Sequence, residues 1–155
     1  MLFTGQSQHS IDPKLRLAVP AKYRNQWDPL RDGSAWYGLP WPTGHLRLYT
    51  ENTFAALSPD AGTNALRPAD DDAKEEANFF SFAERLEMDS AGRINLNKRH
   101  LELAGLGNEV VIVGARNRLE IHDVRRWEAD ERTRFEALTK SRHGLPAAGK
   151  LAGGA

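Results

Sequence analysis

Residues 9–24 of the chain read HSIDPKLRLAVPAKYR. This pattern predicts a strand, a tight turn that begins at Asp12 and ends at Arg16, a second strand, and a helix that begins at Pro20. An aspartate that opens a turn can accept hydrogen bonds from the backbone N–H groups just after it. Proline suits the first position of a helix, because the amide hydrogen that it lacks would have no partner there. The stretch therefore predicts a β-hairpin that leads directly into a helix.

The same arrangement returns in residues 86–98, which read LEMDSAGRINLNK. Asp89 and Arg93 follow the aspartate and arginine of the first stretch at a constant spacing of 77 positions. A later pair of predicted strands, Leu46–Thr50 and Leu119–Asp123, repeats at a spacing of 73. An internal repeat of this kind indicates two copies of one structural unit. We therefore expect a mostly β fold with short helices (α+β), built from two tandem pseudo-symmetric halves.

The two copies differ at the residue before the arginine. Gly92 stands there in the second copy, where a hairpin turn often needs a positive φ that glycine adopts without a Cβ penalty. Leu15 stands there in the first copy, so its turn is expected to be of another type or slightly strained. Asn97 can cap the second helix in the place that Pro20 takes in the first copy. Each unit thus presents a turn that carries an exposed arginine.

The repeat also sets the expected domain boundaries. We expect a first repeat, a linker with the start of a connecting helix, a second repeat and a disordered basic tail, at residues 1–58, 59–78, 79–140 and 141–155. Each half, of about 60–75 residues, would be only marginally stable alone, so the two halves are expected to share one core. Phe80 and Trp127 are assigned to that core. Trp41 lies between two prolines and is expected to be exposed or at a subunit contact.

The composition limits the class of protein. The 21 basic and 21 acidic residues give a formal net charge of zero, which counts mildly against DNA binding because DNA-binding domains are usually basic. The charge is segregated, however: the first 31 residues hold five basic and two acidic side chains, and local patches steer ligands. The chain has no cysteine, no signal-like start and no apolar run of about 20 residues that could span a membrane. We therefore expect a cytoplasmic protein with no membrane contact.

The arginines of the two turns are the candidate functional residues. Arg16 and Arg93 could simply pair with the aspartates of their own turns, in exposed ion pairs worth about 0–1 kcal/mol. Two matching copies on equivalent elements favour DNA contact instead, and both interpretations hold together if the aspartate orients the arginine. Asp12 and Asp89 are therefore given that structural role. Lys14, inside the first turn, is assigned to a DNA phosphate, with a solvated surface lysine as an equal alternative.

Over residues 1–140 the chain resembles the MraZ family of bacterial transcription regulators. The resemblance rests on FTG at residues 3–5, HSIDPKLRL at 9–17, PAKYR at 20–24, DSAGRI at 89–94, VVIVG at 110–114 and NRLEI at 117–121. It implies two fused swapped-hairpin β-barrel halves of the AbrB/SpoVT type that assemble into a closed homo-oligomeric ring. It also implies binding to double-stranded DNA in the nucleoid, at short direct repeats upstream of the division and cell-wall gene cluster. The chain departs from the family at Leu15, which is usually glycine, and at Asn97, which is usually proline.

No arrangement of catalytic residues is visible in the sequence. There is no G-x-S-x-G motif, and Gly105-Leu106-Gly107 is not followed by the Gly-Lys-Ser/Thr of a phosphate loop. Glu120 and His122 share one face of a strand, but two ligands do not make a metal site. We expect no enzyme activity, no cofactor, no metal and no small-molecule ligand. The rival hypothesis is an oligomeric assembly module that binds protein partners, which the neutral net charge suggests.

Overall fold

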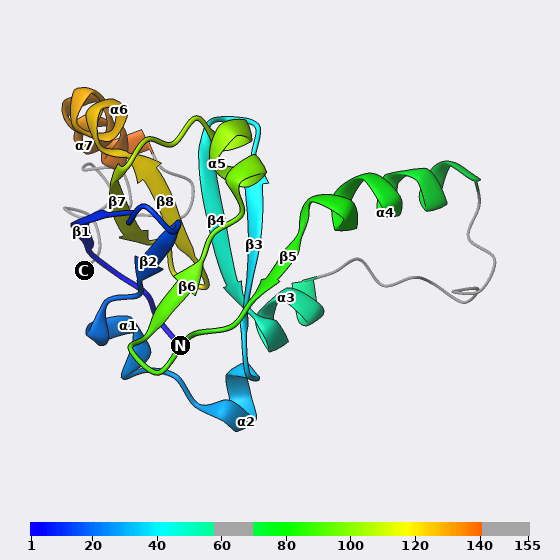
Figure 1. Cartoon of the computed structure of the whole chain (residues 1–155). Coiled ribbons are helices and arrows are strands. Elements are labelled where there is room, and N and C mark those ends of the chain that lie inside the picture. Colours follow the sequence, from blue (N-terminus) through cyan, green and yellow to red (C-terminus); the bar gives the residue numbers. More distant parts are fainter. Residues whose placement is uncertain (58–69, 141–155) are drawn as a thin grey trace, which may run out of the picture. The chain divides into compact units, whose positions relative to one another are not determined.

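The computed structural model describes residues 1–57 and 70–140 (Figure 1). They fall into two compact units, the first of which ends at Asp123 and the second of which begins at Val124. The strands are β1 (Gln6–Ser10), β2 (Arg16–Ala18), β3 (Trp36–Trp41), β4 (His45–Thr50), β5 (Glu84–Leu86), β6 (Arg93–Asn95), β7 (Glu109–Gly114) and β8 (Leu119–Asp123). The helices are α1 (Ala21–Arg24), α2 (Pro29–Asp32), α3 (Glu51–Leu57), α4 (Asp70–Phe82), α5 (Lys98–Ala104), α6 (Val124–Ala129), α7 (Glu131–Ala137) and the 3-10 helix η2 (Leu138–Lys140). The expected tail and most of the expected linker lie outside the described residues. The division into two repeats at the expected boundaries stays a prediction.

The strands of the first unit form two antiparallel sheets. The larger sheet has the order β1-β7-β8-β4-β3-β5, and β2 pairs with β6 in a separate two-stranded ribbon. The mostly β fold with short helices is thus confirmed. The six-stranded sheet is open, with β1 and β5 at its edges, so the swapped-hairpin barrel stays a prediction.

The two strands that flank each aspartate turn do not pair with each other. This corrects the two simple hairpins expected from the sequence. β1 pairs with β7, β5 pairs with β3, and β2 pairs with β6. The backbone bonds outside these ladders follow the same exchange: Val19 N–H donates to Gly92 O at 2.9 Å, and Leu96 N–H donates to Leu15 O at 2.7 Å. The two bonds are equivalent, because Val19 and Leu96, and likewise Leu15 and Gly92, are 77 positions apart. Each turn is therefore held by a residue from the opposite half of the chain.

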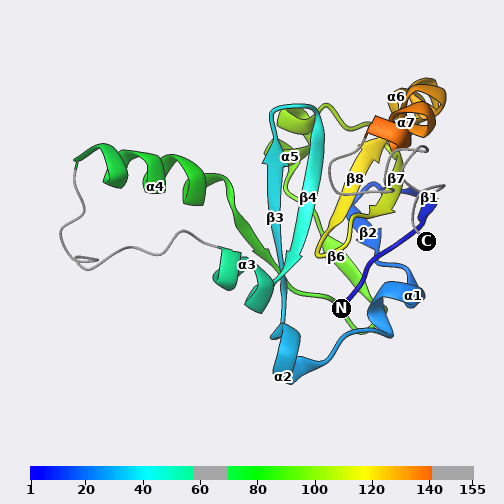
Figure 2. The same cartoon turned by 180° about the vertical axis from the view of Figure 1, so that it is seen from behind.

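The core lies between the six-stranded sheet and a second layer that contains the β2–β6 ribbon and α5. On the sheet side, the alternate strand residues that face this layer are almost fully buried: Trp36, Leu46, Leu48, Val110, Ile112, Leu119 and Ile121. Leu17 and Ile94 of the ribbon join the same cluster. Figures 1 and 2 show α5 against one face of β3 and β4 and α3 on the other face. The two halves share one core, as their size requires.

The helices begin and end largely where the sequence indicates. Asn97 caps α5, because its side-chain oxygen accepts a hydrogen bond of 2.8 Å from Arg99 N–H. Pro20 stands one residue before α1, at the cap position rather than the first helical position. No described helix is long and apolar enough to cross a membrane.

Two aromatic residues that the sequence assigned to the core are not fully buried. Phe80 on α4 is 40% exposed, and α4 buries none of its residues. Among the described residues, Phe54 of α3 contacts the rings of Phe79 and Phe80, but this contact leaves both side chains partly exposed. Trp127 on α6 is only half-buried, and the guanidinium carbon of Arg134 lies 3.5 Å from the centre of its ring. Trp36, by contrast, is fully buried.

Candidate nucleic-acid interface

The two aspartate turns have the same hydrogen-bond pattern, atom for atom. In the first turn, Asp12 Oδ1 accepts from the backbone N–H groups of Lys14 and Arg16, both at 2.9 Å. Its Oδ2 accepts from Arg16 Nε at 2.7 Å. Each aspartate therefore closes its turn and holds the arginine of that turn at the same time.

The second turn repeats these bonds. Asp89 Oδ1 accepts from the N–H groups of Ala91 and Arg93 at 2.9 Å, and Oδ2 accepts from Arg93 Nε at 2.8 Å. A backbone bond of 2.9 Å from Gly92 N–H to Asp89 O also matches the bond from Leu15 N–H to Asp12 O in the first turn. Two turns of one geometry thus present two arginines.

The turns keep this common shape although one contains glycine and the other leucine. Gly92 has a φ of +76° and Leu15 a φ of +62°. A leucine in the left-handed region costs roughly 1–2 kcal/mol, so the first turn is strained rather than of another type. The Leu15 side chain packs against the core cluster, and this burial offsets part of the strain.

The same hydrogen bonds keep the two turn aspartates in their charged form. The backbone hydrogen bond from Arg16, followed by its guanidinium, lowers the pKa of Asp12 below its ordinary value, and Arg93 does the same for Asp89. Both carboxylates are therefore ionised at neutral pH. The arginine side chains stay 33% and 37% exposed, so each guanidinium is oriented by its aspartate and still open to solvent.

Both arginines lie on one face of the β2–β6 ribbon. Leu17 pairs with Ile94 in the ladder, and both side chains are buried. Because successive strand residues point to opposite faces, Arg16 and Arg93 on either side of this pair point outward. The ribbon therefore buries its aliphatic face and presents an arginine from each half of the chain on the other.

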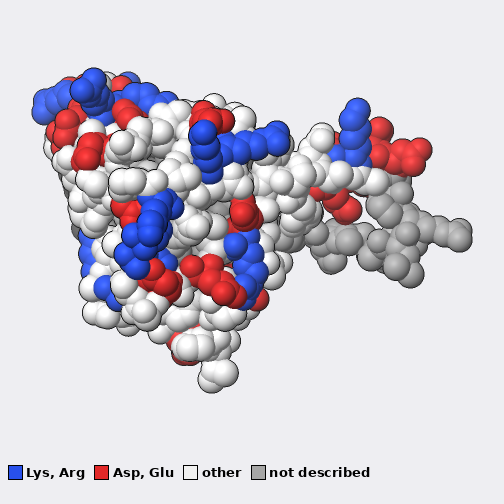
Figure 3. All heavy atoms as spheres, in the orientation of Figure 1, with Lys and Arg blue, Asp and Glu red and all other residues white. Residues whose placement is uncertain are grey.

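The surroundings of this face are mixed in charge. On the side of the molecule shown in Figure 3, basic side chains lie beside acidic ones and do not form one broad basic patch. Lys14 is exposed within the first turn. Arg24 lies beside Gly92 of the second turn, and its Nε donates to Val19 O at 2.8 Å. An attraction for DNA at this face would thus depend on a few oriented cations and little on bulk charge.

Comparison with known proteins agrees with the motifs. A sequence model of the family described as "MraZ protein, putative antitoxin-like" matches residues 79–143. A protein of Ligilactobacillus salivarius named "Transcriptional regulator MraZ" is 36% identical over 129 residues, which cover 83% of this chain and 85% of that protein. This chain belongs to the MraZ family. MraZ proteins of Heliobacterium modesticaldum (35% identity, 81% of this chain and 84% of the relative) and Pelodictyon phaeoclathratiforme (30% identity, 88% and 95%) carry the same name. The MraZ family model covers the second aspartate turn, and the relatives span most of the chain.

Besides the predicted residues, this MraZ chain holds a buried polar cluster that the sequence did not indicate. Glu120 and His122 share one face of β8, as expected, but strand pairing places His45 of β4 directly opposite His122. Burial, the largest influence, lowers the pKa of His45 to about 4. Burial alone would raise the pKa of Glu120, but the hydrogen bond from His122 and the charges of His45 and Arg118 lower it to about 2. The 73-residue repeat makes β4 and β8 equivalent strands, but it aligns His45 with Arg118 and does not indicate that His45 faces His122.

Proposed function

We propose that the chain is a transcriptional regulator that binds double-stranded DNA through the outward face of the β2–β6 ribbon. The observation that carries the proposal is the presence of Arg16 and Arg93 on one exposed face, each oriented by its own aspartate. A two-stranded ribbon fits the major groove of B-DNA, where arginine reads guanine through two hydrogen bonds. Since Nε of each arginine is bound to aspartate, the Nη groups are the ones available to bases.

The spacing of the ribbon supports this role. Arg16 lies opposite Asn95 and Arg93 lies opposite Ala18, so the two arginines are two ladder positions apart. Two positions span about 7 Å along a strand, which is close to two base-pair steps of about 3.4 Å each. Lys14, beside Arg16 in the turn, is proposed to contact a phosphate and to supply affinity without sequence preference.

The proposed target is the set of short direct repeats upstream of the chain's own operon, in the division and cell-wall gene cluster. Two facts support it: membership of the MraZ family, and the relatives that are named transcriptional regulators. The proposal places the protein on the nucleoid in the cytoplasm, and it requires no cofactor and no enzymatic step.

A DNA-binding measurement with matched variants tests the proposal. Fluorescence anisotropy with a labelled duplex from upstream of the gene should show that Arg16→Ala or Arg93→Ala weakens binding by about 1–3 kcal/mol, while Lys14→Ala mainly reduces the salt dependence. Arg85→Ala is the control, because Arg85 is also ion-paired and 39% exposed but lies on β5. Equal affinity of the Arg16 and Arg93 variants and the control would contradict the assignment. A failure of the parent chain to bind this DNA at any salt concentration would favour the rival assembly module.

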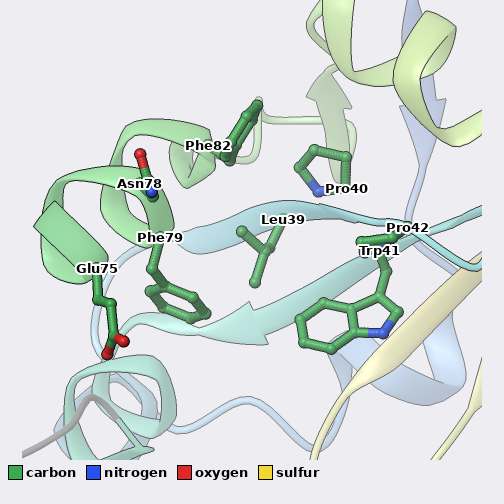
Figure 4. Close-up of a pocket in the computed structure, with 8 residues that line it drawn as sticks. All are labelled: Leu39, Pro40, Trp41, Pro42, Glu75, Asn78, Phe79 and Phe82. Carbon is green, nitrogen blue, oxygen red and sulfur yellow. The ribbon is translucent and has the colours of Figure 1, made fainter.

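We also propose that the chain works as a homo-oligomer, a ring according to the family resemblance. The support is an apolar hollow of about 410 Å³ between α4 and β3, in which Leu39, Trp41, Phe79 and Phe82 line the walls (Figure 4). Phe79 and Phe82 stay 37% and 39% exposed, and exposed apolar patches of this kind mark protein contacts. The proposed occupant is a second copy of this chain.

Light scattering after size-exclusion chromatography tests the assembly. We expect a defined oligomer for the parent chain and a shift to smaller species for Phe79→Ser with Phe82→Ser. Leu30→Ser is the control, because Leu30 is 94% exposed but lies on α2. A monomeric parent chain, or an unchanged oligomer in the double variant, would contradict the proposal.

A further inference from the structure

Three side chains with metal-binding atoms meet at the junction of β4 and β8. His45 lies directly opposite His122 in the ladder, and Glu120 precedes His122 by two residues on the same strand face. Glu120 Oε1 is 2.9 Å from His122 Nε2 and 3.5 Å from His45 Nε2. The two imidazole rings are stacked, with centres 4.6 Å apart. One nitrogen from each histidine and one carboxylate oxygen all lie within 4.8 Å of one another.

These three groups are shielded from bulk water. The side chains of His45, Glu120 and His122 are 8%, 13% and 18% exposed. Two imidazoles and a carboxylate are a set that Zn²⁺ and other divalent transition ions accept, with the remaining coordination position left for water. We propose that His45, Glu120 and His122 form a binding site for one divalent transition-metal ion, of which Zn²⁺ is the representative.

Neighbouring residues orient the ligands in the way that metal sites require. Arg118 binds the other carboxylate oxygen of Glu120, with Nε at 2.8 Å and Nη2 at 2.7 Å from Oε2. This arrangement leaves Oε1 directed at both histidines. Thr43 Oγ1 lies 3.3 Å from His45 Nδ1, so the ring of His45 is held with Nε2 toward the site. Such outer contacts fix ring orientation and ligand basicity in known metal sites.

Without a metal ion, the guanidinium group of Arg47 holds His45 in its observed position. Arg47 Nε donates to His45 Nε2 at 3.1 Å, and its guanidinium carbon lies 3.7 Å from the centre of the Trp41 ring. A metal ion and Arg47 would thus compete for the same lone pair of His45. Arg47 can release the histidine and keep its contact with Trp41. The guanidinium groups of Arg47 and Arg118 repel a dication, so the affinity should be moderate, and Arg47→Met should strengthen Zn²⁺ binding.

The ordinary alternative is a purely structural network of ion pairs and hydrogen bonds. Such a network would need both histidines only for packing and would bind no ion. The two interpretations differ in stoichiometry, in the effect of Arg47 and in the spectrum of a bound ion. The test therefore measures these three quantities on the full chain.

The experiment uses the purified chain after treatment with a chelator and dialysis. Calorimetric titration with ZnCl₂ should show one ion per chain. His45→Ala and His122→Ala should each weaken binding at least tenfold, since each removes a ligand. His9→Ala is the control, because His9 lies on β1 and contacts Ser7. Arg47→Met should bind Zn²⁺ more tightly than the parent chain.

A second measurement keeps the test independent of folding of the histidine variants. Titration of the parent chain with CoCl₂ should produce visible absorption bands stronger than those of aqueous Co²⁺, and excess ZnCl₂ should remove them. Circular dichroism reports whether the variants are folded. The proposal is overturned if the parent chain shows no saturable Zn²⁺ binding, if folded His45 and His122 variants bind as tightly as the control, or if the Co²⁺ spectrum stays that of the aqueous ion.

Discussion

Replacing Gly92 with alanine should lower the free energy of unfolding by about 2 kcal/mol. The φ of Gly92 is +76°, and an L residue in this region costs roughly 1–2 kcal/mol. The new Cβ would also lie 2.5 Å from Arg24 Cδ. Arg24 must then move and lose its hydrogen bond to Val19 O, which costs about 1 kcal/mol. The smaller conformational freedom of alanine in the unfolded chain offsets about 0.5 kcal/mol of this loss.

Urea denaturation followed by tryptophan fluorescence measures the effect, and a double-mutant cycle with Arg24→Ala separates its two causes. In the Arg24→Ala background, Gly92→Ala should cost about 1 kcal/mol less, because the crowded side chain is gone. Leu15→Ala is the comparison at the equivalent position, which already holds an L residue at a φ of +62°: it adds no backbone strain, so its loss of stability reports only the packing of Leu15 against the core cluster and should not change in the Arg24→Ala background. A loss below about 0.5 kcal/mol, or an equal loss with and without Arg24, would refute the reasoning.

Three further changes test other parts of the structure. Asn97→Ala should lower the free energy of unfolding by about 1 kcal/mol because Arg99 N–H loses its acceptor, whereas Asn97→Ser should retain most of the stability in the same urea assay. Burial lowers the pKa of His45 to about 4 in the folded chain. As the pH falls, His45 therefore binds a proton in the unfolded chain before it does so in the folded chain. The chelator-treated parent should therefore lose up to about 3 kcal/mol of stability as the pH falls from 6.5 to 4, and His45→Gln should lose less; parallel pH profiles would contradict this. Asp12→Ala should weaken DNA binding about tenfold in the anisotropy assay, although it removes a negative charge, since Arg16 loses its orientation; tighter binding would show that charge alone matters.

The sequence predicted the local features well, because their causes lie within a few residues. The turn at Asp89 needs a carboxylate and an arginine at fixed spacing, and Gly92 between them adopts its positive φ without strain; the structure shows all three in these positions. The cap at Asn97 is local in the same way. The DNA-binding roles of Lys14, Arg16 and Arg93 are still predictions.

Features that depend on distant pairing could not be predicted in the same way. The apolar alternation around Leu17 fits any strand partner, and the sequence does not state that the partner is Ile94 rather than its own hairpin neighbour. For the same reason, the sequence does not show that His45 lies opposite His122. For Phe80, helical spacing identified an apolar side, but spacing alone does not say whether another layer of the chain covers it.

The exchange of strands between the two halves has a consequence for how the chain reaches its native state. Leu17 and Ile94, which are 77 positions apart in a chain of 155 residues, must meet before either turn gains its full set of backbone bonds. Closing so large a loop is entropically costly and slows the search for native contacts. Folding should therefore be late and cooperative, with neither half persisting as an ordered intermediate during synthesis.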